Sequence, residues 1–251
     1  MFIENAPVDS VSEIQPGIHL LKVYSPSIAK NSRPGQFCNI KVSETKFPLL
    51  RRPFSICNVD GDFIYFMFNV YGEGTKLLSI KKKNETIDVL GPLGNGFDLD
   101  GNYKQAIIVA GGLGSAPFAY VTKSFINKNV ISFIGGRSKK DVITYGLLNI
   151  KSVTEDGSLG MKGNVIDLLK NNISEIDIDN SRIFACGPNA MLRALKSFAM
   201  ENSIECYAST ECAMACGFGI CQGCPIENAD TDGYKLVCKD GPVFNVKDVV
   251  I

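Results

Sequence analysis

Residues 105–117 read QAIIVAGGLGSAP, an apolar run that ends in a glycine turn. Such a run is typical of a strand that is buried on both faces of a parallel sheet. Residues 115–129, SAPFAYVTKSFINKN, follow it and predict a helix. A strand, a glycine turn and a helix in this order can place backbone N–H groups against the phosphates of a nucleotide. The turn lacks the G-x-G-x-x-G spacing of the Rossmann fold, and tight strand-to-helix packing is the alternative reason for Gly111, Gly112 and Gly114.

The same pattern returns twice further along the chain. The apolar runs VISFIGG, residues 130–136, and SRIFACGP, residues 181–188, predict two more buried strands. Helical spacing of apolar residues follows each of them, at 164–172 and 189–202. Strands that alternate with helices predict a parallel α/β sheet. The third strand ends in Cys186-Gly187-Pro188, so this turn should lie at the sheet edge where ligands of such sheets bind.

Residues 1–100 have a different character. They contain short runs rich in β-branched and aromatic residues, namely IHLLKVYS, GQFCNIKVS, RPFSICNV and DFIYFMFNVY. Turn signals such as Pro34-Gly35 separate these runs, which predicts an antiparallel barrel or sandwich. The pattern changes again near residue 208, where a stretch rich in cysteine and glycine begins. We therefore expect three domains, at residues 1–100, 101–207 and 208–251.

Two short motifs of the first domain carry groups that suit a flavin dinucleotide. Arg52-Pro53-Phe54-Ser55 places a guanidinium and a hydroxyl three residues apart on a predicted strand. The guanidinium suits a pyrophosphate, and the hydroxyl can hydrogen-bond the polar edge of a flavin ring. Downstream, Gly72-Glu73-Gly74-Thr75 opens a predicted helix, where glycines let the backbone approach phosphate oxygens. The alternatives are an ordinary edge strand and a glycine turn that Thr75 caps.

Four cysteines lie in MACGFGICQGC, residues 214–224, and LVCKD, residues 236–240. The first three follow the C-x4-C-x2-C spacing of plant-type 2Fe–2S ferredoxins, and a distant fourth thiolate completes the set: Cys216, Cys221, Cys224 and Cys238. Structural zinc sites usually pair two short Cys-x2-4-Cys knuckles, and only one such pair is present, so zinc is the alternative. Cys212 lies at C-x3-C from Cys216, which does not fit the pattern, and we leave it out of the ligand set.

The composition excludes several classes of function. A formal net charge of +0 gives no indication of nucleic acid or an anionic membrane as partner. No apolar run is long enough to span a membrane. The single histidine, His19, lies in the alternating stretch GIHLLKVYS and is expected on a strand, so a site with several histidines is excluded. The start, MFIENAPVDS, lacks the features of a signal peptide, and with the thiolate cluster this predicts a cytoplasmic protein.

Together these motifs resemble the ferredoxin–NADP⁺ reductase superfamily, in which a flavin barrel bearing R-P-x-S precedes an α/β domain bearing GG-x-G-x-AP and CGP. With the C-terminal cysteines added, nearly the full length resembles the electron-transfer subunits of class 1B, NAD-dependent dihydroorotate dehydrogenases. The resemblance rests on the stretches LLRRPFSI, GEGTKLL, DVLGPLGNGF, VAGGLGSAP, FACGPNAML, MACGFGICQGC and VCKDGPVF.

The resemblance implies three cofactors or co-substrates: FAD, a 2Fe–2S cluster and NAD⁺. FAD would contact residues of the barrel, namely Arg52, Pro53, Phe54, Ser55, Met67, Phe68, Asn69, Gly74 and Thr75. NAD⁺ would dock on the α/β domain near Gly111, Gly112, Gly114, Cys186, Gly187 and Pro188. The ligands of the cluster would be Cys216, Cys221, Cys224 and Cys238.

The resemblance also implies a partner. The cluster would exchange electrons with a separate FMN-containing catalytic subunit, which oxidises dihydroorotate in pyrimidine biosynthesis, in a heterotetramer with two copies of each chain. Subunits of the same build in ferredoxin reductases, sulfide dehydrogenases and hydrogenase complexes are the alternatives, and a zinc-stabilised binding module is an alternative of another class. Arg137, after the second strand, could favour the 2′-phosphate of NADP⁺, whereas the resemblance favours NAD⁺.

Overall fold

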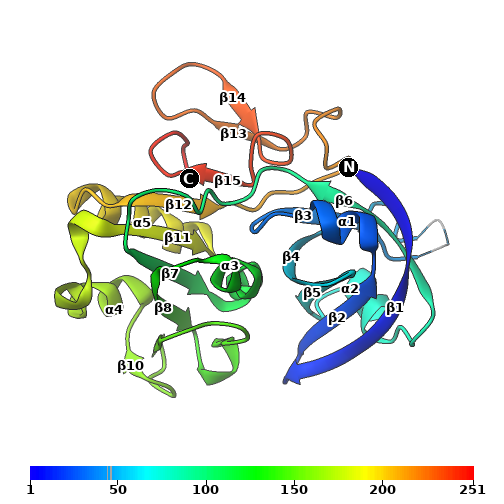
Figure 1. Ribbon diagram of the computed structural model, residues 1–251, viewed down its shortest axis with the longest axis horizontal. Coiled ribbons are helices and arrows are strands. Elements are labelled where there is room, and N and C mark those ends of the chain that lie inside the picture. The colour runs from blue at the N-terminus through cyan, green and yellow to red at the C-terminus, as the bar shows by residue number, and fades with distance from the viewer. Residues whose placement is uncertain (44, 46) are drawn as a thin grey trace.

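The computed structural model describes residues 1–43, 45 and 47–251. They form a closed barrel, a seven-stranded sheet with helices on both faces, and a small C-terminal segment. Figure 1 shows the barrel and the sheet side by side, with the C-terminal segment lying across the top of both. The structure therefore confirms the predicted combination of an antiparallel barrel with a parallel α/β sheet.

Six antiparallel strands close the barrel in the order β1-β2-β5-β4-β3-β6. Their bounds are β1 Phe2–Gln15, β2 Ile18–Tyr24, β3 Phe37–Lys41, β4 Arg52–Asp60, β5 Phe63–Asn69 and β6 Thr86–Leu93. Two helices belong to this part, α1 Pro26–Asn31 and α2 Glu73–Ser79. Alternate residues such as Val23, Ile64 and Phe66 are fully buried in the barrel core, which is the burial pattern of strands with one face inward. His19 lies on β2, as its alternating stretch predicts.

Strand β6 takes in the first part of the glycine-rich stretch GPLGNGF, residues 91–97, which lies at the boundary between the barrel and the sheet. Gly91, Pro92 and Leu93 belong to β6, where Gly91 pairs with Phe2 of β1 and Leu93 pairs with Phe37 of β3. Only the residues after Leu93 connect the barrel to the sheet.

The second part is a sheet with the strand order β10-β9-β8-β7-β11-β12-β15, parallel except for the pairing of β12 with β15. Its strands are β7 Gln105–Gly111, β8 Asn129–Gly136, β9 Ile150–Thr154, β10 Met161–Lys162, β11 Ser181–Cys186, β12 Glu205–Ser209 and β15 Val243–Asn245. Its helices are α3 Phe118–Ser124, α4 Val165–Asn171 and α5 Asn189–Glu201, with the 3-10 turns η1 Gly112–Ser115, η2 Lys139–Asp141, η3 Ile173–Glu175 and η4 Ile178–Asn180.

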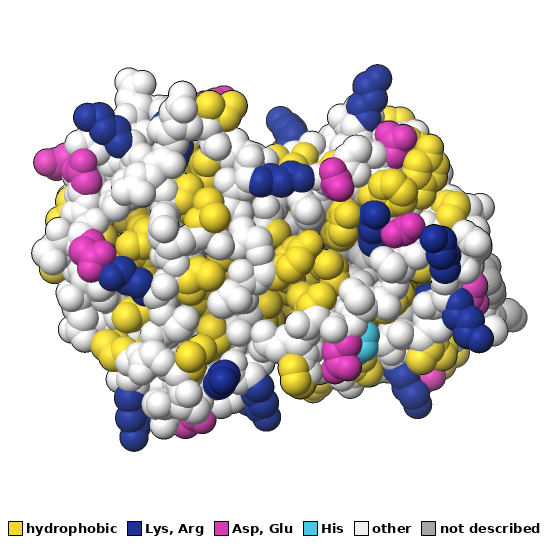
Figure 2. Space-filling view, turned by 60° about the horizontal axis from the view of Figure 1, so that its bottom comes forward, with side chains coloured by type: hydrophobic (Ala, Val, Ile, Leu, Met, Phe, Trp, Pro, Cys, Tyr) yellow, Lys and Arg dark blue, Asp and Glu magenta, His cyan; other side chains and the backbone are white. Residues whose placement is uncertain are grey.

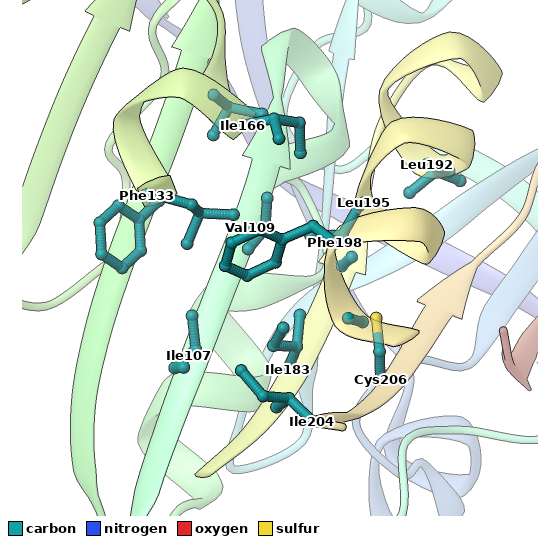
Figure 3. Close-up of a cluster of buried hydrophobic side chains, with 14 of the residues drawn as sticks. Ile107, Val109, Phe133, Ile166, Ile183, Leu192, Leu195, Phe198, Ile204 and Cys206 are labelled. Atoms are coloured by element: carbon teal, nitrogen blue, oxygen red, sulfur yellow. The ribbon is translucent and has the colours of Figure 1, made fainter. Parts of the chain in front are cut away.

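Strand β7 shows why this sheet is buried on both faces. Ile107 and Val109 point into the core that α4 and α5 cover, while Ala106, Ile108 and Ala110 belong to the core on the side of α3. Figure 3 shows Leu192, Leu195 and Phe198 of α5 lying over Val109 and Ile183. The three layers explain the continuous apolar run of β7, because neither of its faces meets water.

The helix predicted over residues 115–129 is shorter in the structure. A 3-10 turn occupies Gly112–Ser115, and α3 ends at Ser124 because Phe125 adopts an extended conformation. Asn127 then has a φ of 56°, in the left-handed region that a helix cannot contain.

The C-terminal segment contains a hairpin of β13 Pro225–Glu227 and β14 Tyr234–Leu236. The next strand of this segment, β15, does not join the hairpin. It pairs with β12 at the edge of the large sheet. Residues 208–251 thus contribute a strand to the sheet of the preceding domain. Among the described residues, the structure contains no helix with the length and apolar character needed to cross a membrane.

Candidate functional site

A cavity of about 260 Å³ lies between the barrel and the large sheet. The space-filling view shows apolar side chains gathered between the two halves of the molecule (Figure 2). Strands β4 and β5 pair in the barrel and together carry most of the barrel side of the cavity. Of the nine barrel residues that the resemblance assigned to FAD, two do not line this cavity, Arg52 and Gly74. The other seven line it: Pro53, Phe54, Ser55, Met67, Phe68, Asn69 and Thr75.

Arg52 and Gly74 lie next to each other outside this lining. A Cβ on Gly74 would lie 3.5 Å from Arg52 Nε and 3.3 Å from Val42 Cγ2, so Gly74 packs beside both side chains at the first turn of α2. Arg52 Nη1 donates a hydrogen bond to the Leu50 carbonyl at 2.5 Å. The Thr75 hydroxyl accepts hydrogen bonds from the Tyr71 and Gly72 N–H groups, at 2.9 and 3.2 Å, so it also shapes the turn that opens α2.

The opposite wall of this cavity comes from the large sheet and from the residues after β12. It contains Leu113, Ala116, Pro117, Cys186, the segment Ser209–Cys212 and Met214. Burial raises the pKa of the Cys186 thiol to about 12, and the charge of Glu211 acts in the same direction, so this thiol stays protonated at neutral pH. The cavity thus borders three parts of the molecule: the barrel, the glycine turn after β7, and the segment that precedes Cys216.

The two glycine turns of the sheet contact each other. A side chain on Gly114 would lie 2.3 Å from the Cys186 carbonyl oxygen, and one on Gly187 would lie 2.6 Å from Met191 Cε. Gly111 is less restricted, because its Cβ would meet the flexible Met191 side chain at Sδ, 2.9 Å away. These glycines have the packing role that the sequence left open as the alternative. Gly112 differs, since it has open space around it and a φ of 55°.

A larger cavity of about 680 Å³ begins at these turns. Gly111, Gly112 and Pro188 line one end, and the cavity continues past the carboxyl ends of β8 and β9 to Glu155 and Asn164. Asn69 and Leu113 line both cavities, so the two spaces meet at these residues. Gly114, Cys186 and Gly187 do not line the larger cavity; Cys186 faces the smaller one.

The four predicted cluster ligands meet as two pairs. The Sγ atoms of Cys216 and Cys221 are 3.3 Å apart, and those of Cys224 and Cys238 are 3.1 Å apart. Cys224 and Cys238 are buried, whereas Cys221 is exposed at the surface. Over residues 1–43, 45 and 47–251 no three metal-ligating side chains are gathered into one group.

The donor set and its backbone fit an iron–sulfur cluster. The Cys221 N–H donates to Cys216 Sγ, and the Cys238 N–H donates to Cys224 Sγ, both at 3.5 Å. Burial raises the pKa of Cys216, but N–H donors from Cys221, Phe218 and Ile220 outweigh it and bring the pKa to about 6. Burial raises the pKa of Cys238 to about 12. Iron binding to such a thiol would release its proton.

Sequence reasoning missed a residue that connects the barrel to this loop. Asn39 is fully buried on β3, beside Pro53 of β4, and its Nδ2 donates to the Cys216 carbonyl at 3.1 Å. A side chain on Gly217, which has a φ of 81°, would lie 2.1 Å from the same Nδ2. The signal for Asn39 is a polar residue inside the apolar strand FCNIK. Glu211 and Cys212 were also missed as cavity residues; both line the smaller cavity and a third hollow of about 470 Å³ with Gly187, Pro188 and Asn189.

Comparison with known proteins agrees with this geometry. Residues 211–250 match the family described as the iron–sulfur cluster binding domain of dihydroorotate dehydrogenase B. The electron transfer subunit of dihydroorotate dehydrogenase B (NAD(+)) from Bacillus cereus strain B4264 is 39% identical over 261 residues, which cover 99% of this chain and 98% of that protein. The same subunit from Bacillus mycoides strain KBAB4 is 40% identical with equal coverage.

Solved structures show the same fold. An NADH-dependent reduced ferredoxin-NADP oxidoreductase superposes with a TM-score of 0.86 at 27% identity, covering 98% of this chain and 90% of that one. A ferredoxin NADP+ reductase from Neisseria gonorrhoeae with bound FAD and NADP superposes with a TM-score of 0.66 at 18% identity, covering 83% of this chain and 94% of that one. With the near full-length identity to the two Bacillus subunits, this chain belongs to the family of electron transfer subunits of dihydroorotate dehydrogenase B (NAD(+)).

Proposed function

We propose that this chain carries electrons between NAD⁺ and a separate catalytic subunit that oxidises dihydroorotate, in pyrimidine biosynthesis. The observation that carries the proposal is the arrangement of the cavities. The smaller cavity shares Asn69 and Leu113 with the larger one and is lined by Cys212 and Met214, just before the first cluster cysteine. A hydride donor, a flavin and a cluster can therefore lie in sequence along one path.

Three sites follow from this arrangement. FAD would lie in the smaller cavity, with Ser55 and Asn69 at the ring and Arg52, Gly74 and Thr75 at the pyrophosphate. NAD⁺ would enter the larger cavity beside Gly111, Gly112 and Pro188, while Gly114, Cys186 and Gly187 hold the two turns together. The ligands of the cluster would be Cys216, Cys221, Cys224 and Cys238. When bound, the flavin and the cluster supply the conversion between two-electron hydride transfer and one-electron transfer.

The protein contributes position and shape. Arg52 would pair with the pyrophosphate, since a guanidinium binds such oxygens as a planar fork. The side chains of Phe54, Met67 and Phe68 would keep water from the ring, because they line the cavity from the barrel. Asn39 would hold the cluster loop to the barrel through the Cys216 carbonyl. We assign the three domains to residues 1–100, 101–207 and 208–251, with the end of β12 and the strand β15 crossing the last boundary into the large sheet.

The assembly is part of the same proposal. The partner would be an FMN-containing catalytic subunit, in a cytoplasmic heterotetramer with two copies of each chain. Cys221 and Ile220 are exposed on the cluster loop, which gives electrons a route out of this chain on that face.

The experiment that tests the function is an anaerobic co-purification of this chain with its candidate catalytic subunit. NADH formation on addition of dihydroorotate, with a requirement for both chains, is the expected result. If the chain contains FAD and iron but the pair forms no NADH, the partner is a different one. The likeness to the ferredoxin-linked oxidoreductase makes reduced ferredoxin the second donor to test in that case.

The Arg52→Ala substitution tests the flavin site. We expect the Kd for FAD to rise by about tenfold, as for the loss of one hydrogen bond to a charged group. The visible absorption of the cluster should survive, because the cysteines lie on another segment. Flavin content after gel filtration measures the effect, and Arg193→Ala on the exposed face of α5 is the matched control. Equal flavin retention in both variants would remove Arg52 from the site.

A further inference from the structure

Asn39 is a buried amide at a position where the barrel has no need of one. It lies on β3 between Cys38 and Ile40, and all three residues are fully buried. Its Nδ2 donates to the Cys216 carbonyl at 3.1 Å, whereas its Oδ1 has no hydrogen-bond partner among the described residues. A buried acceptor without a partner destabilises a fold. An apolar side chain would avoid this loss, so the stability of the barrel does not account for Asn39.

The backbone of Asn39 is held from the side of the flavin motif. Arg51 Nη1 donates to the Asn39 carbonyl at 3.3 Å and to the Asp88 carbonyl at 3.2 Å. Arg51 Nη2 also forms an ion pair with Asp88 Oδ2 at 2.7 Å. Across the strand pair, Asn39 lies opposite Pro53, inside the motif at residues 52–55. Asn39 thus connects the strand that carries this motif to the loop of the first cluster cysteine.

The loop packs tightly against the amide. Gly217 follows Cys216 and has a φ of 81°, in the left-handed region that favours glycine. A Cβ on Gly217 would lie 2.1 Å from Asn39 Nδ2. The peptide unit between Cys216 and Gly217 is therefore fixed twice, by the hydrogen bond to its carbonyl and by the close approach of the next residue.

The orientation of this peptide unit determines where the following N–H groups point. The N–H groups of Phe218, Ile220 and Cys221 donate to Cys216 Sγ, and the last of these hydrogen bonds measures 3.5 Å. Hydrogen bonds to a ligand sulfur are one of the means by which a protein sets the reduction potential of an iron–sulfur cluster. The contact of Asn39 with the Cys216 carbonyl lies at the start of this turn, so it can control all three donors.

The same strand also contacts the other pair of cysteines. Phe37 lies two residues before Asn39 on β3, and such residues share one face of a strand. Phe37 belongs to the small core that contains Cys224 and Cys238, and it also lines the smaller cavity. Strand β3 therefore reaches both cysteine pairs and the cavity assigned to FAD.

We propose that Asn39 is a positioning residue for the iron–sulfur cluster, which fixes the Cys216 peptide and with it the N–H groups that donate to Cys216 Sγ. This assignment rests on the proposed function, because it takes the four cysteines as ligands of the cluster. An N–H group directs the positive end of its dipole at the sulfur, so it stabilises the more negative, reduced state of the cluster. Loss of the amide should therefore make the cluster harder to reduce.

The test compares the purified chain, loaded with FAD and iron, as wild type, Asn39→Leu and Gln105→Leu. Leucine has a shape similar to that of asparagine but lacks both polar atoms. Gln105 is the matched control, since it is also a buried amide that donates to a backbone carbonyl, that of Glu175, at 3.0 Å. It begins β7, at the end of the strand opposite the glycine turn. Redox titration with EPR detection measures the cluster, and deuterium exchange of residues 216–221 measures the loop.

Asn39→Leu should lower the midpoint potential of the cluster. At the wild-type midpoint, the ratio of reduced to oxidised cluster should fall about threefold to tenfold, as for the loss of one or two net hydrogen bonds. The g values of the reduced cluster should shift, and exchange of residues 216–221 should become at least about threefold faster. Gln105→Leu should leave all three quantities unchanged, even if its Tm falls.

Two results would overturn the assignment and leave the proposed function intact. One is a folded Asn39→Leu protein in which the midpoint potential does not fall or the loop exchanges as slowly as in the wild type. The other is an equal change in Gln105→Leu, which would indicate general loosening of the fold. If circular dichroism shows that Asn39→Leu does not fold, Asn39→Ala decides by the same measurements. A wild type that binds no iron would overturn the proposed ligand set, and the assignment with it.

Discussion

Replacing Cys221 with serine is expected to prevent assembly of the 2Fe–2S cluster while FAD stays bound. Serine retains the size of the side chain but removes one of the four thiolates that we propose as ligands of the two irons. Cys221 is the exposed member of the set, whereas Cys224 and Cys238 are packed with Leu236 and Phe244 in a small core. Substitution at Cys221 therefore removes a ligand without opening that core. Iron and acid-labile sulfide content, with the flavin spectrum, measure both expectations.

Cys212→Ser is the matched control for this variant. Cys212 lies next to the same core, yet the spacing of the motif leaves it outside the ligand set. It should keep iron at the wild-type level, and NADH oxidation by an artificial acceptor should continue in Cys221→Ser. Iron loss in Cys212→Ser together with retention in Cys221→Ser would show that the ligand set is different. Loss of FAD from a folded Cys221→Ser protein would show that the two sites are not separate.

Gly114→Ala is expected to destabilise the protein at the contact between the two glycine turns of the large sheet. The added carbon would lie 2.3 Å from the Cys186 carbonyl oxygen and 2.7 Å from Gly187 Cα. Both are backbone atoms, which cannot move aside as a flexible side chain could. Overpacking of this kind costs about 1–3 kcal/mol, so we expect the Tm to fall by roughly 3–10 °C. Differential scanning fluorimetry measures the loss.

The matched control is Gly72→Ala, because no atom lies within 4 Å of the position of its added carbon and its φ is −145°. Its Tm should stay within about 2–3 °C of the wild type, since an N-cap change from glycine to alanine costs about 1 kcal/mol or less. Equal losses of Tm in the two variants would mean that the turns at Gly114 and Cys186 can separate at little cost. Affinities for FAD and NAD⁺ should fall together in Gly114→Ala, because Leu113 beside it lines both cavities.

The sequence allowed the main architecture to be predicted where the signal was local. The apolar run of β7 and the helical spacing of Leu192, Leu195 and Phe198 each depend on residues that are close in the chain. The barrel could be predicted only as a barrel or a sandwich, because its closure depends on β1 and β6, which pair across the chain between Phe2 and Gly91. Strand β15 is three residues long, and no local pattern distinguishes so short a strand from a loop.

The residues of the candidate site could likewise be predicted only where a local motif identified them. Motif residues such as Ser55 and Thr75 could be assigned because their types suit a ligand, and the structure brings both to one cavity. Asn39, Cys212 and Glu155 could not be assigned, because each reaches the site only through the way in which distant segments of the chain pack together. Glu155 reaches the larger cavity only through the register of β9 on β8, in which Thr154 pairs with Gly136.

The pairing of β15 with β12 gives the C-terminal segment a structural role in the large sheet, besides supplying the cysteines. A chain shortened to its first 209 residues would leave β12 as the outermost strand, with a row of N–H and C=O groups open to water. Unprotected edges of this kind recruit strands from other molecules and lead to aggregation. Short strands and covering loops are common ways to block such recruitment. Strand β15, Val243–Asn245, therefore also protects the edge of the large sheet from self-association. Removal of the C-terminal segment would expose β12, so this segment is not an independent module.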